Sequence, residues 1–311
     1  MADPVSEVSS RRVIFGTPDG ADLKENGFIC ADMHFHTNAS DSFTKAEQAV
    51  ALARARGVNL AITDHNLVHN AVRMADRTDV MVVPGMEVST TDGPHILVWF
   101  YEARELQSFW QREIRSRLQV CPWLALRDCK VEKLLELLEP EHCVISAAHP
   151  MGYFGNNKGL EACIRKGYID KSVLKGLDAY EVICSGMTHS ANLAAIKAAE
   201  GYGLSRTGGS DGHILGAVGT AVTVAEAADR TQFLDAIAEN RSFVIGREKD
   251  ISGKVLTGST SLIRFLEHAP SAVYVQTKSA GYSAVRASKK AGRTVSNAFT
   301  GRKRDDSDKK E

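Results

Sequence analysis

The 311-residue chain lacks long hydrophobic runs, and none approaches the ~18 apolar residues that a membrane-spanning helix needs. Its first residues, MADPVSEVSSRR, do not include the apolar core of a secretory signal peptide. The six cysteines form no C-x-x-C pair, which argues against a zinc ribbon and favours reduced thiols over a disulfide scaffold. These absences predict a cytoplasmic enzyme or binding protein with no membrane span.

The sequence also lacks net charge, because 38 Lys and Arg balance 38 Asp and Glu. The balance is uneven along the chain. From Lys278 to the end, ten basic side chains stand against four acidic ones, so the body of the chain is acidic. The body therefore shows no basic surplus typical of a nucleic-acid groove. The basic tail is predicted to be a solvated terminus, with at most a weak contact to nucleic acid or an anionic membrane surface.

Common catalytic signatures are missing as well. The Gly-rich stretch GYFGNNKG at 152–159 lacks the G-K-[S/T] ending of a phosphate-binding loop. The sequence shows neither a G-x-G-x-x-G fingerprint nor a recognisable Ser-His-Asp arrangement. The sequence therefore disfavours an enzyme that uses a phosphate-binding loop or a dinucleotide cofactor, and it disfavours a serine nucleophile.

What the chain does contain is a regular alternation of short apolar runs with helical patterns. Runs such as GFICADMH and VNLAITDH predict strands, and KAEQAVALARARG between them predicts a helix that ends at Gly57. Strands alternating with helices indicate a largely parallel sheet that is buried on both faces. About seven such units are too many for a small open sheet, so we predict an α/β barrel. The stretch 104–139 is predicted to be helical.

Three segments are expected along the chain. Residues 1–27 are polar and form an N-terminal leader that packs on the domain edge. Residues 28–250 form the single folded domain, and 251–311 form a C-terminal extension that is basic and disordered from about 284.

Side chains that bind metals recur where the predicted strands end. His34 and His36 follow the first strand, and an H-x-H on a strand presents both imidazoles on one face. Glu87 lies inside an apolar run, where a buried carboxylate must be paired or bound to a cation. Taken singly, T-D-H or S-D-G-H also fits an ordinary turn. Six of the ten histidines, however, fall at predicted strand ends: His34, His36, His65, His95, His149 and His213. Loops after barrel strands meet on one rim, so these side chains are expected to converge.

In order and type, these residues resemble the PHP (polymerase and histidinol phosphatase) family. The matching positions are His34, His36, Asp41, Asp64, His65, Glu87, His95, His149, Asp211 and His213. The resemblance spans about residues 29 to 247 and is to small stand-alone PHP proteins, in which PGMEVS and HILVWF have close counterparts. It implies a distorted (β/α)7 barrel.

The resemblance further implies two or three divalent metal ions per chain. The first would be held by His34, His36, Glu87 and Asp211. Glu87 would bridge to a second ion held by His95 and His149. A third would be held by Asp41, His65 and His213. Mixed imidazole and carboxylate ligation suits Zn, Mn or Fe. Asp64 would orient a ligand or a loop.

Other candidates for the catalytic site are single residues near the predicted rim. Lys158 could reach a substrate phosphate, although a solvated loop lysine is the simpler interpretation. Arg206 is a weaker phosphate-contact candidate. His189 follows the strand EVICS and could face the rim.

The chemistry implied is metal-dependent phosphoester hydrolysis, because clustered divalent ions activate water and neutralise phosphoryl oxygens. The substrates implied are nucleotides, nucleoside bisphosphates or oligonucleotide 5′ ends. Histidinol phosphate, or a non-catalytic metal-binding module, is the alternative. The presence of all nine ligands favours an enzyme.

Overall fold

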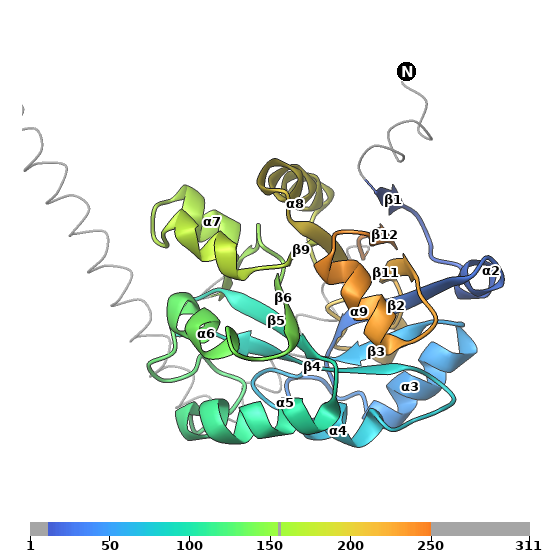
Figure 1. Ribbon diagram of the computed structural model, residues 1–311, viewed down its shortest axis with the longest axis horizontal. Helices are drawn as coiled ribbons and strands as arrows, with labels where there is room; N and C mark the ends of the chain where they lie inside the picture. The colour runs from blue at the N-terminus through green and yellow to red at the C-terminus, as the bar shows by residue number, and fades with distance from the viewer. Residues whose placement is uncertain (1–11, 155–156, 250–311) are drawn as a thin grey trace, which may run out of the picture.

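The computed structural model describes residues 12–154 and 157–249 (Figure 1). The first eleven residues of the predicted leader and the predicted extension 251–311, including its basic tail, lie outside the described residues. Within the described part of the chain, no helix has the length and apolar character needed to cross a membrane.

Short strands alternate with short helices. The strands are β1 Val13–Phe15, β2 Phe28–Phe35, β3 Asn59–Ile62, β4 Val82–Ser89, β5 His95–Phe100, β6 Cys143–Ala147, β7 Tyr153–Phe154, β8 Asn157–Lys158, β9 Ala179–Cys184, β10 Ser205–Gly209, β11 Ala221–Glu226 and β12 Phe243–Gly246. The helices are α2 Gly20–Glu25, α3 Ala46–Ala55, α4 His69–Met74, α5 Ala103–Phe109, α6 Val131–Leu138, α7 Leu160–Arg165, α8 His189–Tyr202 and α9 Arg230–Ala238. One π-helical turn, η1 Trp110–Ile114, and three 3-10 turns, η2 Arg115–Arg117, η3 Lys171–Gly176 and η4 Leu215–Ala217, complete the set.

The main sheet has the strand order β1-β12-β11-β2-β3-β4-β5-β6-β9-β10. Its last strand curls back to β2, where Phe35 and Gly212 form a parallel bridge and the His36 N–H donates to the Gly212 carbonyl over 3.0 Å. Seven strands, β2 to β6 with β9 and β10, therefore enclose a barrel, and the predicted distorted (β/α)7 fold is confirmed.

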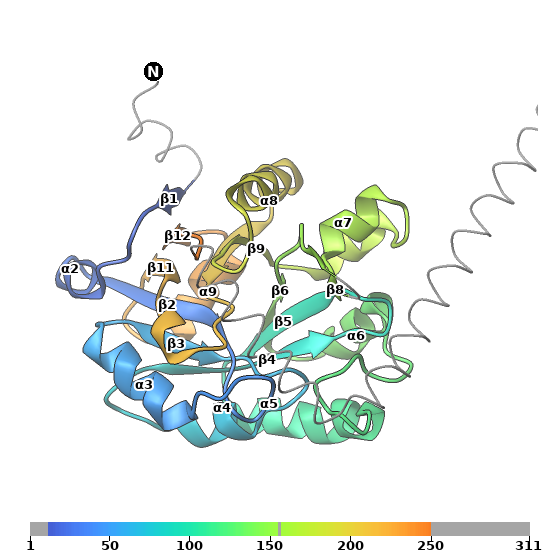
Figure 2. The ribbon, with the colours of Figure 1, turned by 180° about the vertical axis from the view of Figure 1, so that it is seen from behind.

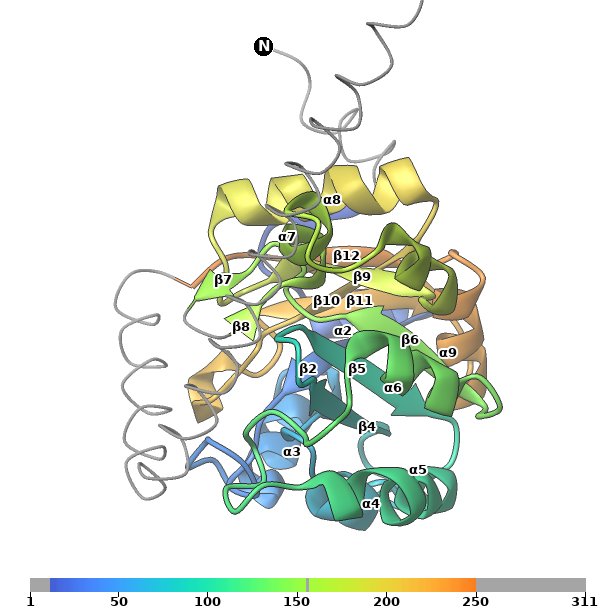
Figure 3. The same cartoon turned by 90° about the vertical axis from the view of Figure 1, so that its left-hand side faces the viewer.

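Helices cover the outside of this curled sheet. The helices α3, α4 and α5 lie along one side, and α7 and α8 lie along the opposite side (Figures 1 and 3). Helix α9 crosses one end of the barrel, where Phe233, Leu234 and Ile237 pack into an interior core with Met33 and Trp99. Figure 2 shows the barrel from the other end.

The sheet is less parallel than the sequence pattern indicates. The pairs β2–β3, β3–β4, β6–β9 and β9–β10 are parallel, but β5 runs antiparallel to both β4 and β6. The tight connection from Ser89 to His95 leaves no room for the crossover that a parallel neighbour would require.

Two local predictions have different outcomes. Helix α3 ends at Ala55, its C-cap is Arg56, and Gly57 follows at φ 66°, as the sequence predicts. The predicted helix over 104–139 is wrong for 118–130. That stretch bonds instead to the β4–β5 hairpin, where the Leu126 N–H donates to Ser89 and the Thr91 N–H donates to Cys129. Helix α6 then begins at Val131.

Residues 13–25, within the predicted leader, contribute β1 and α2. Strand β1 pairs in parallel with β12 at the edge of the sheet.

The closure between β10 and β2 depends on Gly209. A Cβ atom there would lie 2.4 Å from the His34 Cβ and 2.7 Å from the His34 backbone nitrogen, so the strands could not approach as they do. We expect Gly209→Ala to lower the free energy of unfolding by about 1–3 kcal/mol in a urea titration. Gly201→Ala is the control, because Gly201 lies inside α8 with nothing within 4 Å of its Cβ position. That variant should be neutral or more stable by about 0.5–1 kcal/mol, and equal losses in both would contradict the argument.

Candidate metal centre

The nine predicted ligands all come together at the barrel end opposite α9. His34 and His36 end β2, and Glu87 lies near the end of β4. Because β5 runs antiparallel, its first residue, His95, lies at the same end as the last residues of its neighbours. The remaining five come from loops that follow β2, β3, β6 and β10: Asp41, His65, His149, Asp211 and His213.

Four groups within this cluster have ligand atoms within 4.8 Å of one another. They are His36 with Asp41, His65 and His213; His34 with His36 and Asp211; His34 with Glu87 and His149; and His65 with Glu87 and His95. Every side chain is buried except for His95 and Asp211, which are partly exposed.

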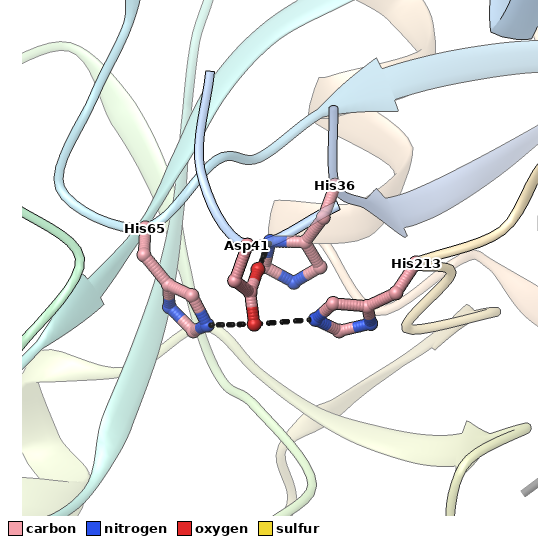
Figure 4. A group of neighbouring side chains, drawn as sticks. All are labelled: His36, Asp41, His65 and His213. Carbon is pink, nitrogen blue, oxygen red and sulfur yellow. Dashed lines mark hydrogen bonds and ion pairs between the residues drawn. The ribbon is translucent and has the colours of Figure 1, made fainter. Parts of the chain in front are cut away.

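The first group surrounds the Asp41 carboxylate (Figure 4). Its Oδ2 atom lies 2.9 Å from His213 Nε2 and 3.8 Å from His65 Nε2, and its Oδ1 atom lies 3.7 Å from His36 Nδ1. The three residues implied for the third ion, Asp41, His65 and His213, therefore lie close together, and His36 is an additional neighbour.

Glu87 occupies the middle of the cluster and touches the other three groups. Its Oε1 atom lies 3.0 Å from His95 Nδ1 and 3.1 Å from His149 Nε2. Its Oε2 atom lies 2.9 Å from His65 Nδ1 and 3.3 Å from the Nε2 atoms of both His34 and His36. A carboxylate in this position can bridge neighbouring cations. His95 and His149 both contact Glu87, but they belong to different groups. The family resemblance instead implies that these two histidines hold the second ion together.

The electrostatics of the cluster keep its carboxylates charged. Burial would raise the pKa of Glu87, but the charges of His65, His34 and His95 hold it well below its usual range. Burial would lower the pKa of His36, but hydrogen bonds with Asp211 and Glu87 raise it to about 10. Burial lowers the pKa of His95 to about 4, despite the charge of Glu87. Buried anions surrounded by imidazoles form a site that attracts cations.

Buried atoms without hydrogen bonds show that this donor set fits divalent metal ions. Glu87 Oε2 and His149 Nδ1 are both buried and make no hydrogen bond among the described residues. The Nε2 atoms of His34 and His36 face each other at 3.1 Å, although each can supply a lone pair. Such groups are costly to bury unless they bind a cation. Imidazole and carboxylate donors suit Zn, Mn or Fe.

Asp64 supports the loop that carries Asp41. Its carboxylate accepts hydrogen bonds from the Thr37 N–H at 2.7 Å, the Thr37 hydroxyl at 2.6 Å and the Ser40 hydroxyl at 2.7 Å. With its oxygens engaged in this way, Asp64 fixes the loop between β2 and α3.

Glu181 on β9 is a supporting residue that the sequence reasoning missed. Its side chain is 1% exposed; Oε1 lies 3.0 Å from His34 Nδ1, and Oε2 accepts from the His149 N–H at 2.7 Å. It therefore holds His34 with Nε2 directed at the cluster. The signal was available, because Glu181 interrupts the apolar run AYEVIC just as Glu87 interrupts its own strand.

Two further residues support the Asp211 turn and were also missed. Asp32 is fully buried and accepts from the backbone N–H groups of Ser210 and Gly219, each at 2.8 Å, and burial raises its pKa to about 6. The Lys249 ammonium donates to the Asp211 carbonyl over 2.9 Å. Asp211 itself has φ 45°, so this turn needs external support.

The predicted phosphate contacts lie outside the four groups. The backbone N–H of Lys158 donates to Gly93 in the β4–β5 turn, and its ammonium lies 5.9 Å from the Tyr168 ring centroid. His189 begins α8 with its Nδ1 atom 3.1 Å from a Glu248 carboxylate oxygen.

Arg206 is not at this end of the barrel, and the prediction of a phosphate contact there needs correction. It is the second residue of β10, whereas Asp211 follows the end of that strand, roughly 15 Å further along extended chain. Its guanidinium bonds to Asn240 in the loop that follows α9. The side chain therefore belongs to the end that α9 closes.

The fold is an α/β barrel with a cluster of potential metal ligands at one end. A family model described as PHP-associated matches residues 189–242, which is 54 of the 311 residues. The matched segment runs from the start of α8 to the residue before β12 and includes two of the nine predicted ligands, Asp211 and His213.

Solved structures share the fold at low sequence identity. PsfC from Pseudomonas syringae PB-5123 is 16% identical, with 76% of this chain and 98% of that chain covered and a TM-score of 0.54. Endonuclease Q, in complex with a 27-mer duplex bearing an abasic lesion, is 15% identical, with 68% and 57% covered and a TM-score of 0.54. The lesion-specific endonuclease PfuEndoQ from Pyrococcus furiosus is 15% identical, with 70% and 57% covered and a TM-score of 0.53. No curated protein matches the sequence.

Proposed function

We propose that this protein is a metal-dependent phosphoesterase acting on nucleotides, nucleoside bisphosphates or oligonucleotide 5′ ends. The observation that carries the proposal is the complete nine-residue cluster with the Glu87 carboxylate at its centre. A degenerate binding module would be expected to lose some of these ligands, whereas here the buried donors converge as a set.

In this proposal the nine residues of the cluster would hold two or three divalent ions. When bound, such ions activate water and stabilise the leaving oxygen of a phosphoester. The chain itself supplies the fixed geometry: Glu181 orients His34, Asp64 holds the Asp41 loop, and Asp32 holds the turn before Asp211. Pre-oriented ligands lower the reorganisation needed during reaction.

The proposed substrate contacts are Lys158 and His189. Lys158 ends β8, and its backbone N–H donates to Gly93 in the β4–β5 turn. Its ammonium is proposed to contact a phosphate group of the substrate. His189 follows β9 and is proposed to contact the part of a longer substrate that extends beyond the cluster. Endonuclease Q shares the fold and was solved with a DNA duplex, so oligonucleotides belong among the substrates to be tested.

Removing metal is the direct test of this function. Elemental analysis of the purified protein identifies the resident ions, and a chelator then removes them. We expect phosphoester turnover to fall on the order of 100-fold or more after chelation and to recover when Mn, Zn or Fe is returned.

The substrate panel should contain a nucleotide, a nucleoside bisphosphate, a 5′-phosphorylated oligonucleotide and histidinol phosphate. Preferential turnover of histidinol phosphate would replace the proposed substrate class with the alternative. If the metal-loaded protein hydrolyses no member of a broad panel, the hypothesis of an enzyme is rejected. The alternative, a non-catalytic metal-binding module, then remains.

A further inference from the structure

A groove on the outer wall of the barrel lies between α4 and α5 and continues along η1. Its volume is about 410 Å³, within the range of small-molecule sites. The residues that matter for its chemistry are Val68, Val72, His69, Trp110, Gln111 and Arg115. Together with Arg73 and Gln107, they give the groove two aliphatic side chains, two aromatic rings, two amides and two guanidinium groups.

The wall of this groove is joined to the metal centre through Asn66, the residue directly after His65. The Trp110 indole N–H donates to the Asn66 carbonyl over 2.8 Å. The Asn66 side chain in turn accepts from the Ser89 N–H at 2.9 Å, and Asn66 has φ 53°. The groove therefore begins at Val68, three residues after the proposed ligand His65, and Trp110 ties its wall to the backbone between them.

The aromatic part of the groove suits a flat ring. Trp110 is 9% exposed and its only polar atom is already bonded, so it contributes a small apolar surface and no hydrogen bond. The exposed His69 ring stands nearly edge-on to it, with centroids 5.3 Å apart and an interplanar angle of 69°. The exposed His69 ring can stack on a nucleobase whose edge contacts Trp110.

The basic part of the groove depends on Arg115. Arg73, which also lines the groove, is neutralised by an ion pair with Glu47. Arg112, one turn before Arg115, pairs with Glu141 over 2.5 Å. Within the described ranges Arg115 forms no ion pair, so its guanidinium is the uncompensated charge at the groove. An exposed guanidinium is suited to bind a phosphate through paired N–H donors.

We propose that the α4–α5 groove binds a second nucleotide unit of the substrate, with its base against Trp110 and His69 and its phosphate at Arg115. This inference rests on the proposed phosphoesterase function and narrows its substrates to those with more than one nucleotide. The metal centre would hold the scissile phosphate, and the groove would hold the neighbouring unit.

The test compares Arg115→Ala with Arg112→Ala in the full-length protein. The probes are a 5′-phosphorylated dinucleotide that carries 2-aminopurine and p-nitrophenyl phosphate, which has no second unit. We expect Arg115→Ala to raise the KM for the dinucleotide about tenfold, with little change in kcat, and to leave p-nitrophenyl phosphate turnover unchanged. Arg115→Lys should recover part of the loss, and Arg112→Ala should behave as wild type.

A second readout does not depend on turnover. Equilibrium binding of the dinucleotide to the metal-free protein, followed by 2-aminopurine fluorescence, should weaken by a similar factor in Arg115→Ala alone. Unchanged dinucleotide binding and KM in that variant, or an equal change in Arg112→Ala, would overturn the groove assignment. If wild type hydrolyses no phosphoester, the proposed function fails, while the binding measurement still decides whether the groove takes a nucleotide.

Discussion

His36→Ala should remove at least one metal ion per chain and lower phosphoester turnover on the order of 100-fold or more. The expected effect is large because His36 belongs to two groups at once. It lies 3.7 Å from Asp41 on one side, and 3.3 Å from Glu87 and 3.4 Å from Asp211 on the other. Its loss also leaves buried carboxylates without an imidazole neighbour, which weakens the cluster beyond the loss of one donor. Metal content by elemental analysis and turnover with a fixed substrate measure the two effects.

The control is His142, an exposed histidine outside the cluster. Its ring stacks on Tyr101 with centroids 3.8 Å apart and takes no part in the four groups. His142→Ala should keep its full metal content and turnover even if it unfolds at a lower temperature. An unchanged metal content in His36→Ala would show that the ligand assignment is incorrect.

Glu181→Gln should weaken metal binding by about 10-fold to 100-fold without removing a ligand. The carboxylate accepts from the His149 N–H and lies beside His34 Nδ1, so an amide of the same size must turn its NH2 toward one of these two donors. The consequence is a misplaced His34 ring or an unsatisfied backbone N–H beside His149. Competition against a chelating dye measures the affinity of the folded variant.

Glu161→Gln is the control for this second prediction. Glu161 is buried to the same extent, at 1% exposure, but it bonds to Tyr180, Tyr202 and Arg165 outside the cluster. That variant should lose thermal stability and retain wild-type metal affinity. Parallel losses of affinity in the two variants would mean that Glu181 acts through general stability and does not position His34.

The barrel and the convergence of the strand-end histidines were predictable because each follows from a repeating rule, whereas Asp41 and the division of the nine residues among ions rest on the family resemblance. Apolar runs of strand length alternate with helical periodicity, and polar side chains at successive strand ends must share a rim. The direction of β5 did not follow from that rule, since an apolar run does not encode strand direction. A local signal was present, however, in Asp92-Gly93 between two short strands, because this dipeptide typically marks a hairpin. Gly93 indeed has φ 115°.

The remaining differences arise from contacts between distant parts of the chain. Arg206 precedes Asp211 by only five residues, yet an extended strand carries the two side chains to opposite ends of the barrel. The segment 118–130 satisfies its backbone groups against the β4–β5 hairpin, a partner that no local pattern reveals. Glu181 was detectable as a carboxylate in an apolar strand, but its role required knowledge of the His34 ring next to it.

Insertions and deletions are expected to be less well tolerated in the β4–β5 turn than in other loops of this protein. Ser89 pairs with His95 and Glu87 pairs with Leu97, so both metal-facing side chains depend on one strand register. Inserting or deleting a single residue in the turn can shift that register and rotate His95 to the opposite face of the sheet. Loops that join helices to strands can absorb such changes, since the helix in between decouples them from the cluster. Variation in chain length is therefore expected to accumulate in loops such as 139–142, between α6 and β6, while the length of the turn between Ser89 and His95 stays constant.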